Sequence, residues 1–115
     1  MNVQIFGVKN DADTRKALRF FKERRIDVHF VDFKVKAPSK GELRRFVQKF
    51  GADTVIDREA KRFKALGLHT AYYSDDRWLE IASEEPLILR TPLVRQQNEL
   101  TVGLAEDTWR AWAGK

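Results

Sequence analysis

The sequence of 115 residues contains no cysteine. This absence excludes disulfides, thiolate metal sites and any catalysis that depends on a thiol of this chain. The sequence also has no run of about 18 apolar residues, which a membrane-spanning helix needs. Residues 1–4 lack the basic and apolar regions of a signal peptide. We therefore expect a cytoplasmic protein with no membrane segment.

The composition fits one domain of ordinary size. Hydrophobic residues make up 43% of the chain and charged residues 34%, which is enough apolar material for a single core. The 22 Lys and Arg residues exceed the 17 Asp and Glu residues, so the net charge is +5. This charge permits binding to nucleic acid or to an acidic protein surface. Acidic residues are interleaved with the basic ones, so a solvated, lysine- and arginine-rich helical surface is the favoured explanation of the excess, and nucleic-acid binding is supported by charge alone.

Hydrophobic periodicity predicts a strand–helix–strand unit at the start of the chain. Residues 2–7 alternate as a strand does, and a helix with one apolar side follows and ends near Arg25. Residues 26–33 are rich in β-branched and aromatic side chains and predict a second strand, parallel to the first.

Helices dominate the middle of the chain, and a hairpin and helix close it. Ser39 and Glu42 have the spacing of a capping box, and Gly51 ends the helix that they open. The remaining predicted elements are helices over 58–66 and from residue 74 or 75 to 85, a hairpin over 93–103 and a helix that begins at Glu106. This order predicts an α/β, thioredoxin-like fold (βαβ…ββα, mixed four-stranded sheet). We expect one domain over 1–115, with halves at about 1–35 and 86–115 and a helical insertion at about 36–85.

The junction between the first strand and the first helix is the natural place for a site. A helix N-terminus there offers free N–H groups and a positive dipole end to an anion. This junction carries Asp11 and Asp13 and no nucleophile. Either aspartate, or Thr14, can cap the helix. The two carboxylates could also act as general acid and base, but nothing else in the sequence supports a hydrolase site.

Four segments carry a resemblance to a known family. They read G-V-K-N at 7–10 with R-K-A-L at 15–18, V-I-D-R at 55–58 leading to Phe63 and Leu66, P-L-I-L-R-T-P-L-V at 86–94, and L-T-V-G at 100–103 before Glu106. In this order and spacing they resemble the ArsC (arsenate reductase) family, with its Spx and YffB-type relatives. The resemblance covers nearly the whole chain.

The departures from the family pattern concern its chemistry. The family's nucleophilic cysteine aligns with Asp11, and the second cysteine of redox-switch relatives aligns with Thr14. The arginine that helps to bind the oxyanion falls at or next to Asp57, with Arg58 adjacent. The arginine before the family's proline is replaced by Thr91. The resemblance therefore implies a fold whose reductase chemistry has been lost.

The resemblance also predicts a vestigial pocket. Its residues would be Lys9, Asn10, Asp11, Thr14, Arg58, Arg90 and Pro92. Pro92 is expected to follow a cis peptide bond and to face the loop at 10–14. Arg58 and Arg90 could line an anion site, or could instead form surface ion pairs with neighbouring acids. His29 and His69 have no partners at ligand spacing, so no metal site is predicted.

Two functions follow from the resemblance. The first is a non-redox binding or regulatory module, Spx-like, with a protein partner. Spx-type relatives dock on the α subunit of RNA polymerase, and the basic helices at 15–25 and 40–49 would be the surfaces to test. The alternative is a residual arsenate reductase-type oxidoreductase that uses an external thiol. Glutathione is expected as a cofactor only under that alternative.

Overall fold

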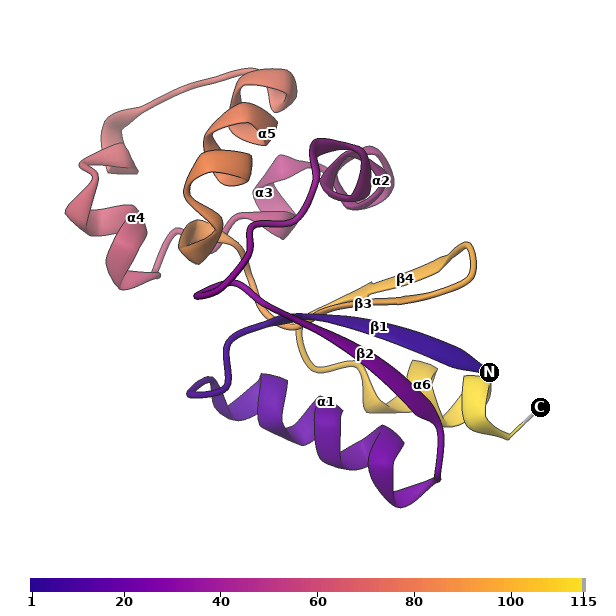
Figure 1. Cartoon of the computed structure of the whole chain (residues 1–115). Helices are drawn as coiled ribbons and strands as arrows, with labels where there is room; N and C mark the ends of the chain where they lie inside the picture. Colours follow the sequence, from indigo (N-terminus) through magenta and orange to yellow (C-terminus); the bar gives the residue numbers. More distant parts are fainter. Residues whose placement is uncertain (115) are drawn as a thin grey trace.

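A mixed four-stranded sheet forms the centre of the computed structural model, which describes residues 1–114 (Figure 1). Strand β1 (Asn2–Gly7) pairs in parallel with β2 (Asp27–Asp32), so the opening strand–helix–strand prediction is confirmed. On its other side β1 pairs antiparallel with β3 (Leu93–Gln96), which continues into β4 (Glu99–Val102). The strand order β2-β1-β3-β4 is that of the predicted thioredoxin-like α/β fold.

Two helices cover one face of the sheet. Helix α1 (Ala12–Glu23) connects β1 to β2. Helix α6 (Glu106–Ala113) follows the hairpin and lies beside α1 (Figure 1). Their aromatic side chains form a cluster with the apolar strand residues that face them. The buried members are Val3, Ile5, Ala17, Phe20, Phe21, Val94, Trp109 and Trp112.

The helical block lies on the opposite face of the sheet, beyond the end of β1 (Figure 1). It consists of α2 (Lys40–Phe50), α3 (Ala52–Val55), α4 (Lys61–Ala65), the 3₁₀ turn η1 (Leu68–Thr70), α5 (Asp75–Glu84) and the 3₁₀ turn η2 (Pro86–Ile88). Phe6 and Leu93 of the sheet share a second core with Phe46 and Trp78 of the block. No helix within residues 1–114 has the length and apolarity to cross a membrane.

The helix boundaries confirm most of the sequence signals and correct one. The Ser39 hydroxyl accepts a hydrogen bond from the Glu42 N–H, and Gly51 ends α2 with φ +82°. The helix predicted over 58–66 begins only at Lys61, so that prediction was wrong at its start. The reason is a turn in which the Asp57 carboxylate accepts a hydrogen bond from the Glu59 N–H at 3.0 Å, because a local side-chain bond competes with the first helical turn. The short helix α3 was not predicted.

Candidate functional site

Asp11 organises the junction between β1 and α1. Its backbone is extended (φ −86°, ψ 127°), as an N-cap requires, and its side chain caps α1. Asp11 Oδ2 accepts hydrogen bonds from the Thr14 N–H at 3.0 Å and from the Thr14 hydroxyl at 2.7 Å. Thr14 is fully buried, so its hydroxyl depends on a protein acceptor. The prediction that an aspartate caps this helix is confirmed for Asp11, while Asp13 lies in the first turn.

A third donor reaches the same oxygen from the far end of the chain. The Thr91 hydroxyl donates to Asp11 Oδ2 at 2.9 Å, across 80 residues of sequence. The Thr91–Pro92 peptide bond is cis, as the resemblance led us to expect. One carboxylate oxygen thus joins the first helical turn to the segment that precedes β3. At this junction the position suited to an anion is filled by the chain's own carboxylate.

Gly7 is the residue at the end of β1 that lets Thr14 approach. A Cβ atom at Gly7 would lie 2.5 Å from Thr14 Oγ1 and 3.0 Å from its Cγ2. We expect Gly7→Ala to displace the Thr14 side chain, to weaken the cap and to destabilise the fold by about 1–3 kcal/mol. Urea unfolding followed by circular dichroism measures this loss.

The matched control for this change is Gly41→Ala in the first turn of α2. A Cβ atom there meets nothing nearer than Ser39 Oγ at 3.9 Å. Because alanine favours a helix over glycine by about 0.5–1 kcal/mol, this variant should be as stable as the parent or more stable. Equal stability of the two variants would show that the contact between Gly7 and Thr14 has no energetic role.

The two arginines of the predicted pocket make their contacts elsewhere. Arg58 pairs with Asp53 at 3.1 Å, and its guanidinium lies over the rings of Phe63 and Trp78, 5.7 and 5.3 Å from their centroids. Arg90 donates from Nε to the Thr54 carbonyl at 2.9 Å. Among residues 1–114, neither arginine has a hydrogen bond or ion pair to Asp11. Both side chains hold the segment around α3.

The remaining pocket residues lie at the surface. Lys9 and Asn10 are exposed, and the Lys9 carbonyl accepts a hydrogen bond from Arg15 Nη1 at 3.0 Å. The structure therefore brings Asp11, Thr14 and Thr91 together. Sequence reasoning noted Thr91 only as a missing arginine and did not identify it as a donor to Asp11. One signal was available in the sequence. Thr91 replaces the family's arginine and Asp11 replaces its cysteine, and a hydroxyl can donate a hydrogen bond to a carboxylate.

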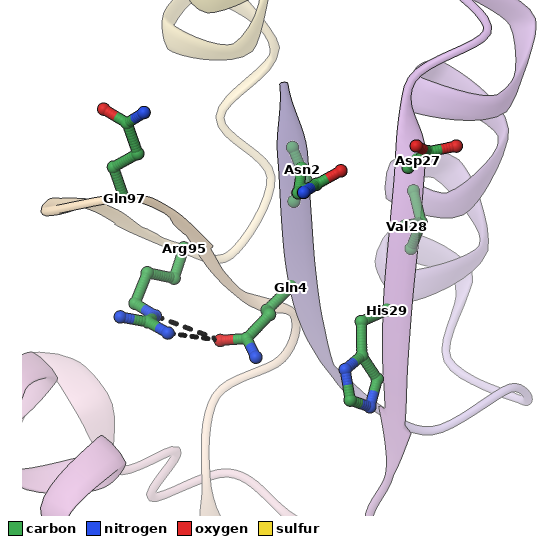
Figure 2. Close-up of a pocket in the computed structure, with 8 residues that line it drawn as sticks. Asn2, Gln4, Asp27, Val28, His29, Arg95 and Gln97 are labelled. Carbon is green, nitrogen blue, oxygen red and sulfur yellow. Dashed lines mark hydrogen bonds between the residues drawn. The ribbon is translucent and has the colours of Figure 1, made fainter.

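A hollow of about 460 Å³ lies on the sheet face opposite α1 and α6. Figure 2 shows Gln4, His29 and Arg95 at this hollow, on three neighbouring strands. Arg95 donates from Nε and Nη2 to Gln4 Oε1 at 3.0 and 2.8 Å, and pairs with Glu42 Oε1 at 3.2 Å. Its guanidinium is therefore occupied in joining β3 to β1 and α2. Within the described residues, no group of three His, Asp or Glu side chains could hold a metal ion.

Comparisons with known proteins agree with this structure. The ArsC family matches residues 6–112. YusI of Bacillus subtilis is 27% identical, over 98% of this chain and 100% of its own. The global transcriptional regulator Spx 2 of Oceanobacillus iheyensis is 29% identical, over 96% of this chain and 82% of its own. The solved structure of a YffB protein superposes with a TM-score of 0.86 and 23% identity, over 95% of this chain and 96% of its own, which shows the shared fold. The chain therefore belongs to the ArsC family.

Proposed function

We propose that this protein is a non-redox member of the ArsC family that acts as a binding or regulatory module. One observation carries the proposal: Asp11, at the family's nucleophile position, already accepts three hydrogen bonds at one oxygen. The donors that could stabilise a thiolate or an anionic substrate are therefore satisfied within the fold.

The chemistry of a carboxylate supports the same conclusion. In this family, arsenate reduction is implied to begin with attack of a thiolate on arsenic, and the chain has no thiol. A carboxylate does not form the arsenic–sulfur bond that glutathione would later resolve. Asp11 also puts a negative charge where the oxyanion would sit, and like charges about 4 Å apart cost roughly 1–4 kcal/mol.

Arsenate reduction by the purified protein is the direct test of lost chemistry. We expect no turnover above background in an NADPH-coupled assay with glutathione, glutaredoxin and glutathione reductase. An ArsC-family reductase that has its cysteine serves as the positive control. Turnover at an enzyme-like rate that is lost in Lys9→Ala or Arg90→Ala would favour the alternative, a residual reductase that borrows an external thiol.

A protein partner is the second part of the proposal. The relatives include proteins named as global transcriptional regulators, at 24–29% identity, and the Spx resemblance points to the α subunit of RNA polymerase. That partner would place the protein in the cytoplasm. Biolayer interferometry with immobilised α subunit should give a dissociation constant in the micromolar range, typical of transient regulatory contacts. Absence of binding at about 100 μM would exclude this partner.

A further inference from the structure

Strand β2 is one of the two edge strands of the sheet. It pairs only with β1, over its full length from Asp27 to Asp32 (Figure 1). On the free side of an edge strand, alternate N–H and C=O groups point away from the sheet and can pair with another chain. The opposite edge, β4, has four residues, and α2 packs against it. Strand β2 has six residues and no proline, so it offers the longer pairing edge.

Apolar hollows lie on both sides of β2. The first, of about 550 Å³, lies toward α1 and is lined by apolar residues with two cations and one acid: Leu18, Ile26, Val28, Phe30, Lys22, Arg25 and Asp27. The second, of about 510 Å³, lies on the opposite side, and its lining includes Val31, Val35, Lys9, Lys36, Asp32 and Glu42. Val28, Phe30 and Val31 are only half-buried. An added strand would send alternate side chains into the two hollows, as strand-addition complexes do.

Most of the net positive charge lies in the segment that contains α1 and β2. Residues 9–36 contain nine Lys and Arg against five Asp and Glu, whereas the rest of the chain has thirteen against twelve. In the part of the chain that the structure describes, every salt bridge uses a cation from outside residues 9–36. The pair of Arg62 and Glu85 in the helical block is one example: hydrogen bonds from Arg62 hold the pKa of the Glu85 carboxyl below its ordinary value. The cations beside β2 thus lack acidic partners within residues 1–114.

Charge and shape together select one kind of occupant. A second copy of the chain would bring its own uncompensated cations to the edge, so pairing of two β2 strands would place like charges together. Nucleic acid binds through phosphate contacts and stacking on exposed aromatic rings. The exposed tyrosines, Tyr72 and Tyr73, lie in the helical block instead. An acidic polypeptide satisfies the backbone edge, the apolar hollows and the cations.

We infer that β2 binds an extended, acidic segment of a partner protein as a fifth strand of the sheet, with alternate apolar side chains in the two hollows. This inference rests on the proposed binding role and identifies the surface and partner chemistry for it. It adds a specific recognition mode, in which backbone hydrogen bonds supply affinity and Lys9, Lys22, Arg25 and Lys36 select acidic sequences.

The probe is a fluorescein-labelled Glu/Val peptide of eight residues with the repeat Glu-Glu-Val-Val, acetylated and amidated at its ends, so that each face of the added strand carries both Val and Glu. In fluorescence anisotropy we expect saturable binding in the micromolar to submillimolar range. A Lys/Val peptide of the same length, and a Glu/Val peptide with N-methylated amides that cannot pair with a strand, should both bind at least tenfold more weakly. In two-dimensional NMR, the amide shifts caused by the Glu/Val peptide should concentrate in residues 27–32.

Charge reversal on the protein separates this surface from the other basic helix. Lys22→Glu combined with Arg25→Glu should weaken binding of the Glu/Val peptide about tenfold. The control pair, Arg44→Glu with Arg45→Glu, changes the net charge equally on exposed residues of α2 that line neither hollow and should weaken binding less than twofold. Circular dichroism checks that both variants are folded.

Several outcomes would overturn the inference. They are equal binding of the N-methylated peptide, an equal loss in the α2 control, shifts outside β2, or no binding at millimolar peptide. Self-association of the chain in sedimentation experiments, together with slowed hydrogen exchange of the β2 amides, would assign the edge to a second copy. Displacement of the peptide by single-stranded DNA at physiological salt would assign it to nucleic acid. If the α subunit binds while the peptide does not, the proposed function stands and the β2 inference fails.

Discussion

Replacing Trp109 by alanine is expected to destabilise the protein by about 3–5 kcal/mol, the usual cost of removing a buried large aromatic side chain. Trp109 is fully buried, and its ring lies 5.7 Å from that of Phe20 and 5.5 Å from that of Phe21. These contacts join α6 to α1 beneath the sheet. The ring also donates from Nε1 to the Thr101 hydroxyl at 2.9 Å, so the substitution removes packing and orphans a buried hydroxyl. Urea unfolding monitored by circular dichroism measures the loss.

Milder changes keep this prediction testable if Trp109→Ala does not fold. Trp109→Phe retains most of the ring and loses the N–H, and should cost about 1–3 kcal/mol because Thr101 remains buried without its partner. Adding Thr101→Val should recover part of that loss, since the unpaired hydroxyl is then removed. If Trp109→Phe is neutral, or if the second change makes the loss larger, the hydrogen bond is not the cause.

The α/β order could be predicted from the sequence because each boundary has a local cause. Ser39 with Glu42, and Gly51 with its positive φ, act on neighbouring backbone groups, and such signals need no tertiary information. The start of α4 could not be placed in this way. Arg58 has a high helical propensity, which favours an earlier start, and the Asp57 turn that precedes α4 is completed by a distant hydrogen bond from the Asp57 N–H to the Ile88 carbonyl at 2.8 Å.

The site was less predictable because its partners are remote in sequence. The cap between Asp11 and Thr14 spans three residues and is visible as a pattern. The bond from Thr91 spans 80 residues and depends on how β3 is placed beside β1. The engagement of Arg90 with the Thr54 carbonyl likewise depends on the position of the unpredicted helix α3. Composition and periodicity carry no information on such pairings.

Asp11→Ala is expected to cost about 3 kcal/mol, more than an exposed helix cap normally contributes. Loss of the cap alone costs about 1 kcal/mol, and the hydroxyls of Thr14 and Thr91 are left without their acceptor. Asp11→Asn keeps an oxygen acceptor and should lose only about 1 kcal/mol. Asp13→Ala is the matched control, because Asp13 lies in the same first turn without capping it, and its loss should stay below about 1 kcal/mol. Equal losses for Asp11→Ala and Asp13→Ala would contradict a central role for Asp11.

A double-mutant cycle between Asp11→Ala and Thr91→Val isolates the long-range contact. We expect a coupling energy of about 0.5–3 kcal/mol, because the two side chains share one hydrogen bond in a partly buried site. Asp11→Cys, which restores the family's nucleophile, should be destabilised about as much as Asp11→Ala, since a thiol is a weak acceptor for the three donors. The same hydrogen bonds that stabilise this junction would then oppose a return to thiol chemistry. Asp11→Cys with parental stability would show that the fold still accommodates a cysteine there.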